Sequence, residues 1–162
     1  MESTERGLLK DYLGRYKRAK DKKEELEARV KMIRADIRFS DGRSMEDETS
    51  LKARISEIEA RIDRQKDTMA KFILETMDIM DYLPSESLER SILEMRHIDC
   101  LSWREICRRQ HMSRTPCCRY YRDGLDTILQ NKRVRKILKE YEESGNKEEK
   151  KNEHTKAHFN ML

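Results

Sequence analysis

The chain has 162 residues, of which 42% are charged and 36% hydrophobic, and its formal net charge at pH 7 is +4. Such a composition does not supply one large globular core, and with 5 Gly and 2 Pro it favours long helices over sheet. The absence of an apolar run of about 18 residues argues against a membrane span. The start lacks the apolar core of a signal peptide. We therefore expect a cytoplasmic protein whose 4 cysteines are reduced thiols.

The first half of the chain carries two heptad seams, in which apolar residues recur at alternating spacings of three and four. The first seam consists of Leu9, Tyr12, Tyr16, Ala19, Lys23, Leu26, Val30, Ile33 and Ile37. The second consists of Leu51, Ile55, Ile58, Ile62, Gln65, Met69, Phe72, Thr76, Ile79 and Leu83. Residues 38–50 between them are rich in small polar residues and lack periodicity, which predicts a loop. Residues 1–83 are therefore predicted to form a long antiparallel coiled-coil hairpin. Because neither helix buries much alone, we expect homo-oligomers through its open side.

Pro84 marks the end of the predicted hairpin, because its ring disfavours helix at the preceding residue and removes a hydrogen-bond donor. A fresh helix can start there, capped by Ser85 or Ser87. Residues 84–141 are predicted to form a separate helical domain. The remainder of the chain is polar and aperiodic, so residues 142–162 are predicted to be a disordered tail.

Residues 101–129 are predicted to form two short helices joined by a tight turn. Ser102 and Glu105 fit a capping box, in which each side chain bonds the other residue's backbone N–H. Ser113 is expected to cap the second helix, and Pro116 falls in its first turn, where a missing N–H costs little. This pattern is typical of a helix-turn-helix, in which one face of the second helix packs and the other enters a major groove of DNA.

The two faces of the second helix differ in composition, and the residues of each recur at helical spacing. The inner face carries Cys117, Tyr120 or Tyr121, Gly124, Leu125 and Ile128. The outer face carries the candidate DNA-binding residues Ser113, Arg114, Thr115, Cys118, Arg119 and Arg122. Residues 101–140 hold 11 Lys and Arg against 4 Asp and Glu, whereas residues 1–100 hold 21 against 23. Positive charge concentrated on one module is the footprint of phosphate neutralisation, so the sequence predicts binding to double-stranded DNA.

Residues 83–129 resemble region 4 of the sigma-70 factors, the domain that reads promoter DNA. The matching elements are Leu88-Glu89-Arg90 with Ile92 and Leu93, Arg96-His97-Ile98, Leu101 through Ile106, Met112-Ser113-Arg114 and Gly124-Leu125. With its N-terminal helical hairpin, the chain is similar to a family of small phage and prophage proteins described as sigma-70 region 4-like transcriptional regulators, akin to late-gene activators. The resemblance implies an all-α regulator that binds promoter DNA, with RNA polymerase as a further possible partner.

The sequence departs from the region 4 pattern at His111, Pro116 and Cys117-Cys118. Region 4 usually has a small residue in the turn and an aliphatic residue at the position of Cys117. The chain also lacks a recognisable sigma region 2, whose aromatic-rich helices melt promoter DNA and grip the polymerase. A regulator that docks on DNA therefore fits better than a self-sufficient sigma factor.

Two other functions agree with the same sequence. A small-terminase-like DNA-packaging protein of phages also combines a helix-turn-helix with helical oligomerisation, and it would assemble into a ring. A coiled-coil adaptor would instead use the basic block to bind an acidic protein. The sequence contains no C-x2-C pair, Gly-rich phosphate loop or recognisable Ser/His/Asp arrangement, so we expect no metal, no cofactor and no enzymatic activity.

Overall fold

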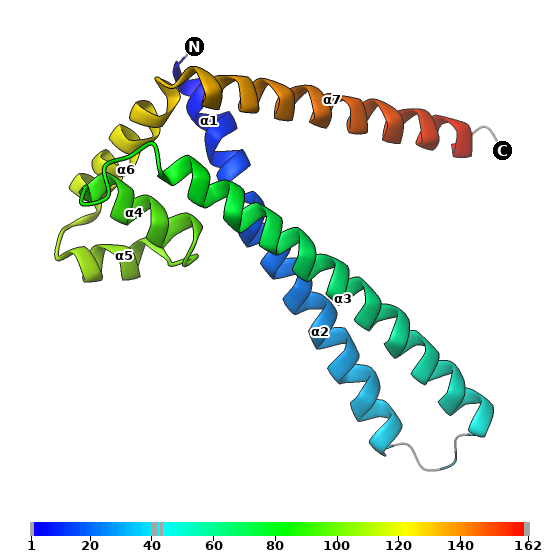
Figure 1. Ribbon diagram of the computed structural model, residues 1–162. Coiled ribbons are helices and arrows are strands. Elements are labelled where there is room, and N and C mark those ends of the chain that lie inside the picture. The colour runs from blue at the N-terminus through cyan, green and yellow to red at the C-terminus, as the bar shows by residue number, and fades with distance from the viewer. Residues whose placement is uncertain (1, 40–41, 43, 161–162) are drawn as a thin grey trace. The chain divides into compact units, whose positions relative to one another are not determined.

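The computed structural model describes residues 2–39, 42 and 44–160 (Figure 1). The helices in chain order are α1 (Glu2–Leu13), α2 (Arg15–Phe39), α3 (Met45–Met80), α4 (Leu88–His97), α5 (Trp103–Gln110), α6 (Arg114–Leu129) and α7 (Lys132–Asn160). No strand occurs among the described residues, which confirms the expected all-α class. The chain divides into two compact units. Unit 1 comprises residues 1–14 and 78–162, and unit 2 comprises residues 15–77.

Unit 2 is an antiparallel helix pair formed by α2 and most of α3 (Figure 1). Its buried residues come from the two predicted seams, because Leu26 and Val30 of α2 pack with Ile55 and Ile62 of α3. Removing these apolar side chains from water is the main force that holds the pair together. The hairpin arrangement of these residues thus agrees with the heptad spacing, whereas the supercoiled geometry of a coiled coil stays a prediction.

Polar contacts between the two helices set which residues lie opposite one another. The side-chain amide of Gln65 donates to the carbonyl oxygen of Ala19 at 3.2 Å. Arg15 donates from Nη2 to Oε2 of Glu75 at 2.7 Å. A polar residue at a seam position specifies register because every other alignment leaves its hydrogen bond unmade. Gln65 therefore serves the register of the pair.

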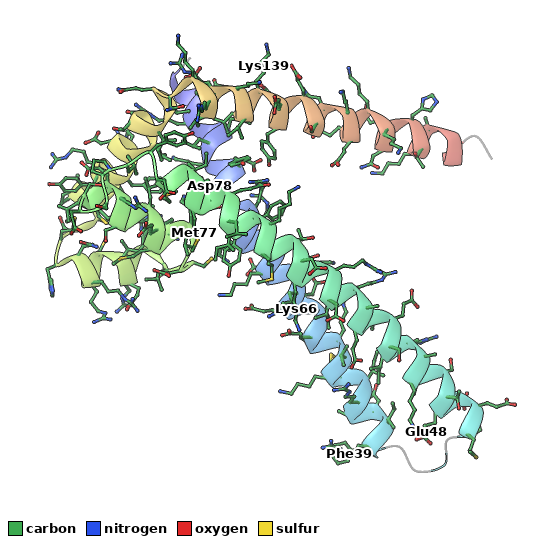
Figure 2. The ribbon with its side chains drawn as sticks, in the orientation of Figure 1. Phe39, Glu48, Lys66, Met77, Asp78 and Lys139 are labelled. Carbon is green, nitrogen blue, oxygen red and sulfur yellow. The ribbon has the colours of Figure 1, made fainter. Side chains whose placement is uncertain are left out.

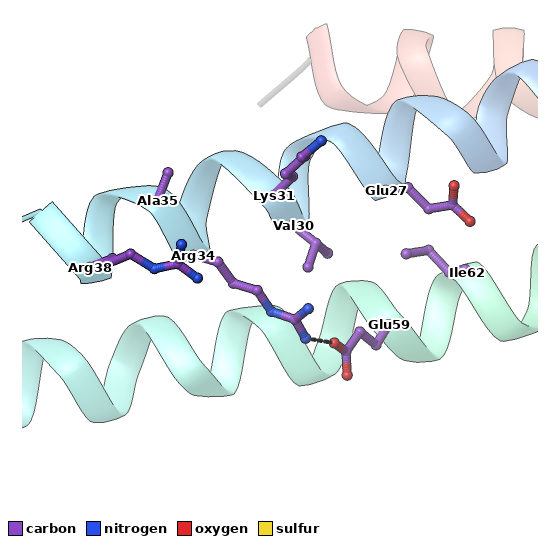
Figure 3. Close-up of a pocket in the computed structure, with 8 residues that line it drawn as sticks. All are labelled: Glu27, Val30, Lys31, Arg34, Ala35, Arg38, Glu59 and Ile62. Carbon is purple, nitrogen blue, oxygen red and sulfur yellow. Dashed lines mark hydrogen bonds and ion pairs between the residues drawn. The ribbon is translucent and has the colours of Figure 1, made fainter.

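One flank of the α2–α3 pair is hollowed, with a volume of about 470 Å³. The hollow is lined by Glu27, Val30, Lys31, Arg34, Ala35, Arg38, Glu59 and Ile62. Figure 3 shows Arg34 reaching across the pair to Glu59, with which it forms an ion pair. Because Val30 and Ile62 reach the wall of this hollow, the helix pair leaves part of its apolar seam open on this side.

The connection between α2 and α3 is shorter than the loop predicted over residues 38–50. Helix α2 continues to Phe39, and Ser44 precedes α3 with its Oγ accepting from the backbone N–H of Asp47 at 3.3 Å. The first turn of α3 holds three acidic residues, which favour the positive end of the helix dipole. The polar residues that were interpreted as loop are therefore helix-start signals. Residues 40, 41 and 43 of the predicted loop lie outside the described residues.

Unit 1 has an apolar core to which six helices contribute. Its fully buried members are Leu9 and Leu13 of α1, Ile79 and Met80 of α3, Ile92 and Leu93 of α4, Ile106 of α5, Cys117, Leu125 and Ile128 of α6, and Val134 of α7. Those of α6 lie on the face that the helical spacing predicted to be apolar. Short helices such as α5 are marginal alone, so their stability depends on this shared core.

Residues 1–14 and 78–83, which the sequence assigned to the hairpin, belong to unit 1. Gly14 separates α1 from α2, which the seam pattern had joined into one helix. Tyr12 of that seam is buried in unit 1, where its ring meets Tyr141 of α7 edge-on at a centroid distance of 5.3 Å. A heptad pattern identifies the apolar face of a helix but not the partner that covers it, which explains the difference.

The break predicted at Pro84 separates α3 from α4. Of the two candidate caps, Ser87 is the one used, because its Oγ accepts from the backbone N–H of Arg90 at 3.2 Å. Arg90 also donates to the carbonyl oxygen of Leu83 at 3.2 Å, which ties α4 to the segment before it. The turn is therefore held by side chains from its own neighbourhood.

Residues 142–160 continue α7, where the sequence predicted a disordered tail. Their side chains are exposed over residues 142–157, so the helix here is not held by burial. The segment is rich in Glu and Lys, which have high helix propensity, and Glu143 precedes Lys147 by one turn. The interpretation weighed the missing apolar periodicity and not this local propensity. Residues 161 and 162 lie outside the described residues.

Helices α4 and α6 cross closely at Gly124. A Cβ placed there would lie 2.6 Å from Cδ1 of Leu93 and 3.1 Å from Cβ of Glu89. Leu93 is fully buried, so its methyl group has no free space into which to move. At Gly7 of α1, by contrast, an added Cβ would meet nothing within 4 Å.

We predict that the same substitution has opposite effects at these two glycines. Gly124→Ala forces a shift of the packed Leu93, costing roughly 1–3 kcal/mol, which outweighs a gain in helix propensity of about 1 kcal/mol. Gly7→Ala gains the propensity without the clash and raises stability. Urea unfolding followed by tryptophan fluorescence measures both. Equal stabilisation by the two variants would show that the α4–α6 crossing is looser than described.

Candidate nucleic-acid interface

Helix α5 begins at Ser102, whose Oγ accepts from the backbone N–H of Glu105 at 3.2 Å. This is one half of the predicted capping box. The Glu105 carboxylate does not complete the other half, because it accepts from Nε of Arg108 and from Nε of Arg109, each at 3.0 Å. These hydrogen bonds, with that of Arg108 the stronger, lower the pKa of Glu105 to about 2. Arg108 and Arg109 therefore share one carboxylate within α5, which offsets one of their two positive charges.

The turn between α5 and α6 is closed by His111, whose backbone lies in the left-handed region at φ 52° and ψ 41°. This conformation favours glycine, so the His111 side chain stands in a backbone region that most residues avoid. Its backbone N–H donates to the carbonyl oxygen of Arg108 at 3.3 Å, and that of Met112 donates to Cys107 at 3.2 Å. The last carbonyls of α5 are thereby satisfied.

Ser113 precedes α6 with an extended backbone, as the prediction of a cap required, but its side chain makes no capping hydrogen bond. The physical reason lies in Pro116. An N-cap side chain accepts from the N–H of the second or third helical residue, and Pro116 is the third and has no N–H. The predicted side-chain cap is therefore wrong, and the Ser113 hydroxyl is left exposed at the start of α6.

The two faces of α6 are divided as the helical spacing predicted. The buried residues are Cys117, Tyr121, Gly124, Leu125, Ile128 and Leu129, so Tyr121 and not Tyr120 is the inward tyrosine. Ser113, Arg114, Thr115, Arg119 and Arg122 are exposed, and Cys118 is half-buried. The six candidate residues thus lie together between the residue that precedes α6 and the middle of this helix, away from its packed face.

Positive charge on the outer face of α6 is uncompensated. Arg114, Arg119 and Arg122 form no ion pair with any residue that the structure describes, and Arg119 lies over the ring of Tyr120 at 5.9 Å. Arg108 of α5 is equally exposed but is paired with Glu105. Arginines without an ion pair can bind an external anion, because no internal ion pair has to be broken first.

Helix α1 covers the second half of α6. Arg6 donates to Asp126 at 2.8 Å from Nη2, and Lys10 lies over the ring of Tyr121 with Nζ 5.7 Å from its centroid. The start of α6, with Ser113, Arg114 and Thr115, is exposed. The sequence interpretation placed α1 in the hairpin and so missed this packing, and no motif in residues 1–14 signals it.

Tyr121 is anchored at the centre of this arrangement. Its hydroxyl lies 2.7 Å from Nε2 of His97 on α4, and its ring meets Trp103 of α5 edge-on at 4.9 Å. His97 also has a hydrogen bond with the backbone of Leu13 at the end of α1. Burial, with a smaller contribution from nearby cations, lowers the pKa of His97 to about 4, and burial raises the pKa of Tyr121 to about 12. Both groups are neutral at pH 7 and hold α1, α4, α5 and α6 together.

None of the four cysteines forms a disulfide among the described residues. Burial, followed by the neighbouring Cys107, raises the pKa of Cys117 to about 11, so this group stays protonated and packs as a small apolar side chain. Within the described part of the chain, no three His, Cys, Asp or Glu side chains are grouped so as to hold a metal ion.

No family model, curated protein or solved structure matches the chain. Each helix in the described ranges is either too short or too polar to cross a membrane. The features that bear on function are thus the geometry and charge of unit 1 itself.

We predict that the His97–Tyr121 contact makes unit 1 sensitive to acid. In the unfolded chain His97 has an ordinary pKa of 6.5, so it takes up a proton before the folded protein does. Stability that is complete above pH 6.5 is lost as the pH falls toward 4, by on the order of 3 kcal/mol at about 1.4 kcal/mol per pKa unit. Urea unfolding between pH 7 and 4 measures this loss.

The matched control is His97→Gln, which cannot take up the proton and should show a flatter pH profile. The comparison removes the contribution of the carboxylates, which is common to both proteins. Parallel profiles for the two proteins would contradict the assignment of the acid sensitivity to His97.

Proposed function

We propose that this chain is a sequence-specific DNA-binding transcriptional regulator of the phage and prophage type, similar to sigma-70 region 4-like proteins. In this proposal α5 and α6 form a helix-turn-helix, and the first half of α6 enters the major groove. The observation that carries it is the uncompensated positive face of α6, opposite a face that is fully packed. A helix-turn-helix reads base edges with the N-terminal residues of its second helix, and the start of α6 is exposed.

The side chains on this face have the chemistry that base reading requires. Arginine donates two hydrogen bonds to guanine, and the Thr115 methyl group is suited to contact with a thymine methyl. Ser113, with no capping hydrogen bond, has a hydroxyl free to donate to a backbone phosphate. Both kinds of contact are thus available on one helix face.

We further propose that unit 2 joins two or more copies of the chain. The open flank of the α2–α3 pair and the exposed apolar residues Met32 and Phe39, at 70% and 81% exposure, support this proposal (Figure 2). One module buries too little surface to select a genomic site, whereas two joined modules roughly add their binding energies. A two-fold dimer would then place its half-sites about one helical turn of DNA, or a multiple, apart.

We predict that arginines of α6 and α5 differ in their contribution to binding, although each substitution removes one charge. Replacing Arg114, Arg119 and Arg122 together with alanine should lower affinity for a mixed-sequence 30-base-pair duplex. The slope of log K against log[salt] should fall by about one for each lost phosphate contact. Where one of these arginines reads a base, its loss should cost about 1–3 kcal/mol at a preferred site.

Arg108→Ala with Arg109→Ala is the control, because both of these arginines are already engaged by the carboxylate of Glu105. We expect this double variant to lose less duplex affinity per substituted arginine than the α6 variant does. The salt titration is followed by fluorescence anisotropy of labelled duplex. If the α5 variant loses as much affinity per arginine as the α6 variant, the assignment of α6 as the recognition helix is wrong.

A further inference from the structure

Unit 1 contains a hollow of about 340 Å³ beside the candidate recognition face. Three helices form it, since its wall consists of Arg6, Gly7 and Lys10 of α1, Trp103 of α5, and Cys118, Tyr121 and Arg122 of α6. Cys118 and Arg122 belong also to the outer face of α6. The hollow is therefore continuous with the surface proposed to meet DNA.

The wall of this hollow is cationic and carries no carboxylate. Lys10 and Arg122 are exposed, and neither forms an ion pair within the part of the chain that the structure describes. Arg6 is engaged by Asp126, so its charge is already compensated. The guanidinium of Arg96 lies over the Trp103 ring at 5.0 Å and adds to the positive potential nearby.

Two unpaired cations on different helices, with aromatic rings between them, are suited to bind a small anion. A phosphate group offers oxygen acceptors to the ammonium of Lys10 and to the guanidinium of Arg122 at the same time. When the second helix of a helix-turn-helix lies in the groove, the elements at its side cross the DNA backbone. In unit 1, the elements at the side of α6 are the start of α5 and the middle of α1.

We propose that this hollow binds a phosphate group of the DNA backbone, held by Lys10 and Arg122. The source of the phosphate rests on the proposed function, whereas the phosphate site itself rests on the hollow and its charges. The assignment gives α1 a part in DNA binding, and it gives Arg122 a backbone partner instead of a base. Lys10 lies outside the helix-turn-helix, and no motif in the sequence pointed to it.

The experiment compares Lys10→Gln with Lys139→Gln in the full-length chain. Lys139 lies on α7 (Figure 2), is exposed, and does not line the hollow, so its loss changes the net charge equally. We expect Lys10→Gln to lower the slope of log K against log[salt] for a mixed-sequence duplex by about one, and Lys139→Gln to leave it unchanged. A thermal melt of each variant verifies the fold. Equal slopes for Lys10→Gln and wild type, or equal losses in the two variants, would overturn the proposal.

A second readout separates this proposal from the proposed function. Trp103 is the single tryptophan of the chain and lies in the wall of the hollow, so its fluorescence reports on occupancy. If wild type binds no duplex, the proposed function fails, and titration with inorganic phosphate then tests the site alone. A saturable change of Trp103 fluorescence in wild type that Lys10→Gln abolishes would establish that the hollow binds free inorganic phosphate. No saturable change, or the same change in both proteins, would remove the site as well.

Discussion

The hydrogen bond between His97 and Tyr121 determines which side of α6 is buried, and the exposed basic face follows from that choice. Tyr121 receives His97 from α4, the edge of Trp103 from α5 and the side chain of Lys10 from α1. Leaving either partner of this buried pair without the other costs the full desolvation of a polar group, so rotating α6 about its axis is unfavourable. Because α6 is held in this rotation, its arginines point away from the core together. The close approach of α4 and α6 at Gly124 supports this orientation of α6, because it brings the two helices near enough for the His97–Tyr121 hydrogen bond to form.

Ion pairing within unit 1 then decides which cations are available to a ligand. Glu105 engages two arginines of α5 and offsets one of their charges, and Asp126 compensates Arg6 of α1. Arg114, Arg119 and Arg122 share one face of α6, with Lys10 beside them, and exposed cations such as Lys139 of α7 lie elsewhere in unit 1. Counting basic residues along the sequence finds the basic module but cannot separate paired from unpaired charges. The candidate surface is therefore defined by two observations together: the arginines of α6 have no ion pair, and they lie on one side of a single helix beside the hollow.

Much of unit 1 could be predicted from sequence because its signals are local. The bounds of α5 follow from Ser102, and the two faces of α6 follow from the spacing of its apolar residues. The missing side-chain cap at Ser113 also has a local cause. Predicting it required noticing that Pro116 has no backbone N–H to donate to the Ser113 hydroxyl. The helical residues 142–160 were missed because propensity without burial leaves no periodic pattern. The packing of α1 on α6 and α7 was not predictable in this way, since Tyr12 fits either an apolar seam or this core equally well. Lys10 joined the candidate site only through that packing.

The central claim is that the outer face of α6 recognises duplex DNA by sequence. Repeated selection of a randomised duplex library by the full-length protein, followed by sequencing of the bound fraction, tests it most directly. The account predicts enrichment of one motif whose half-sites are separated by about one helical turn or a multiple. It also predicts that the chain lacking Arg114, Arg119 and Arg122 fails to enrich that motif. A bound fraction with the sequence composition of the input library, or the same motif selected by both proteins, would contradict the claim.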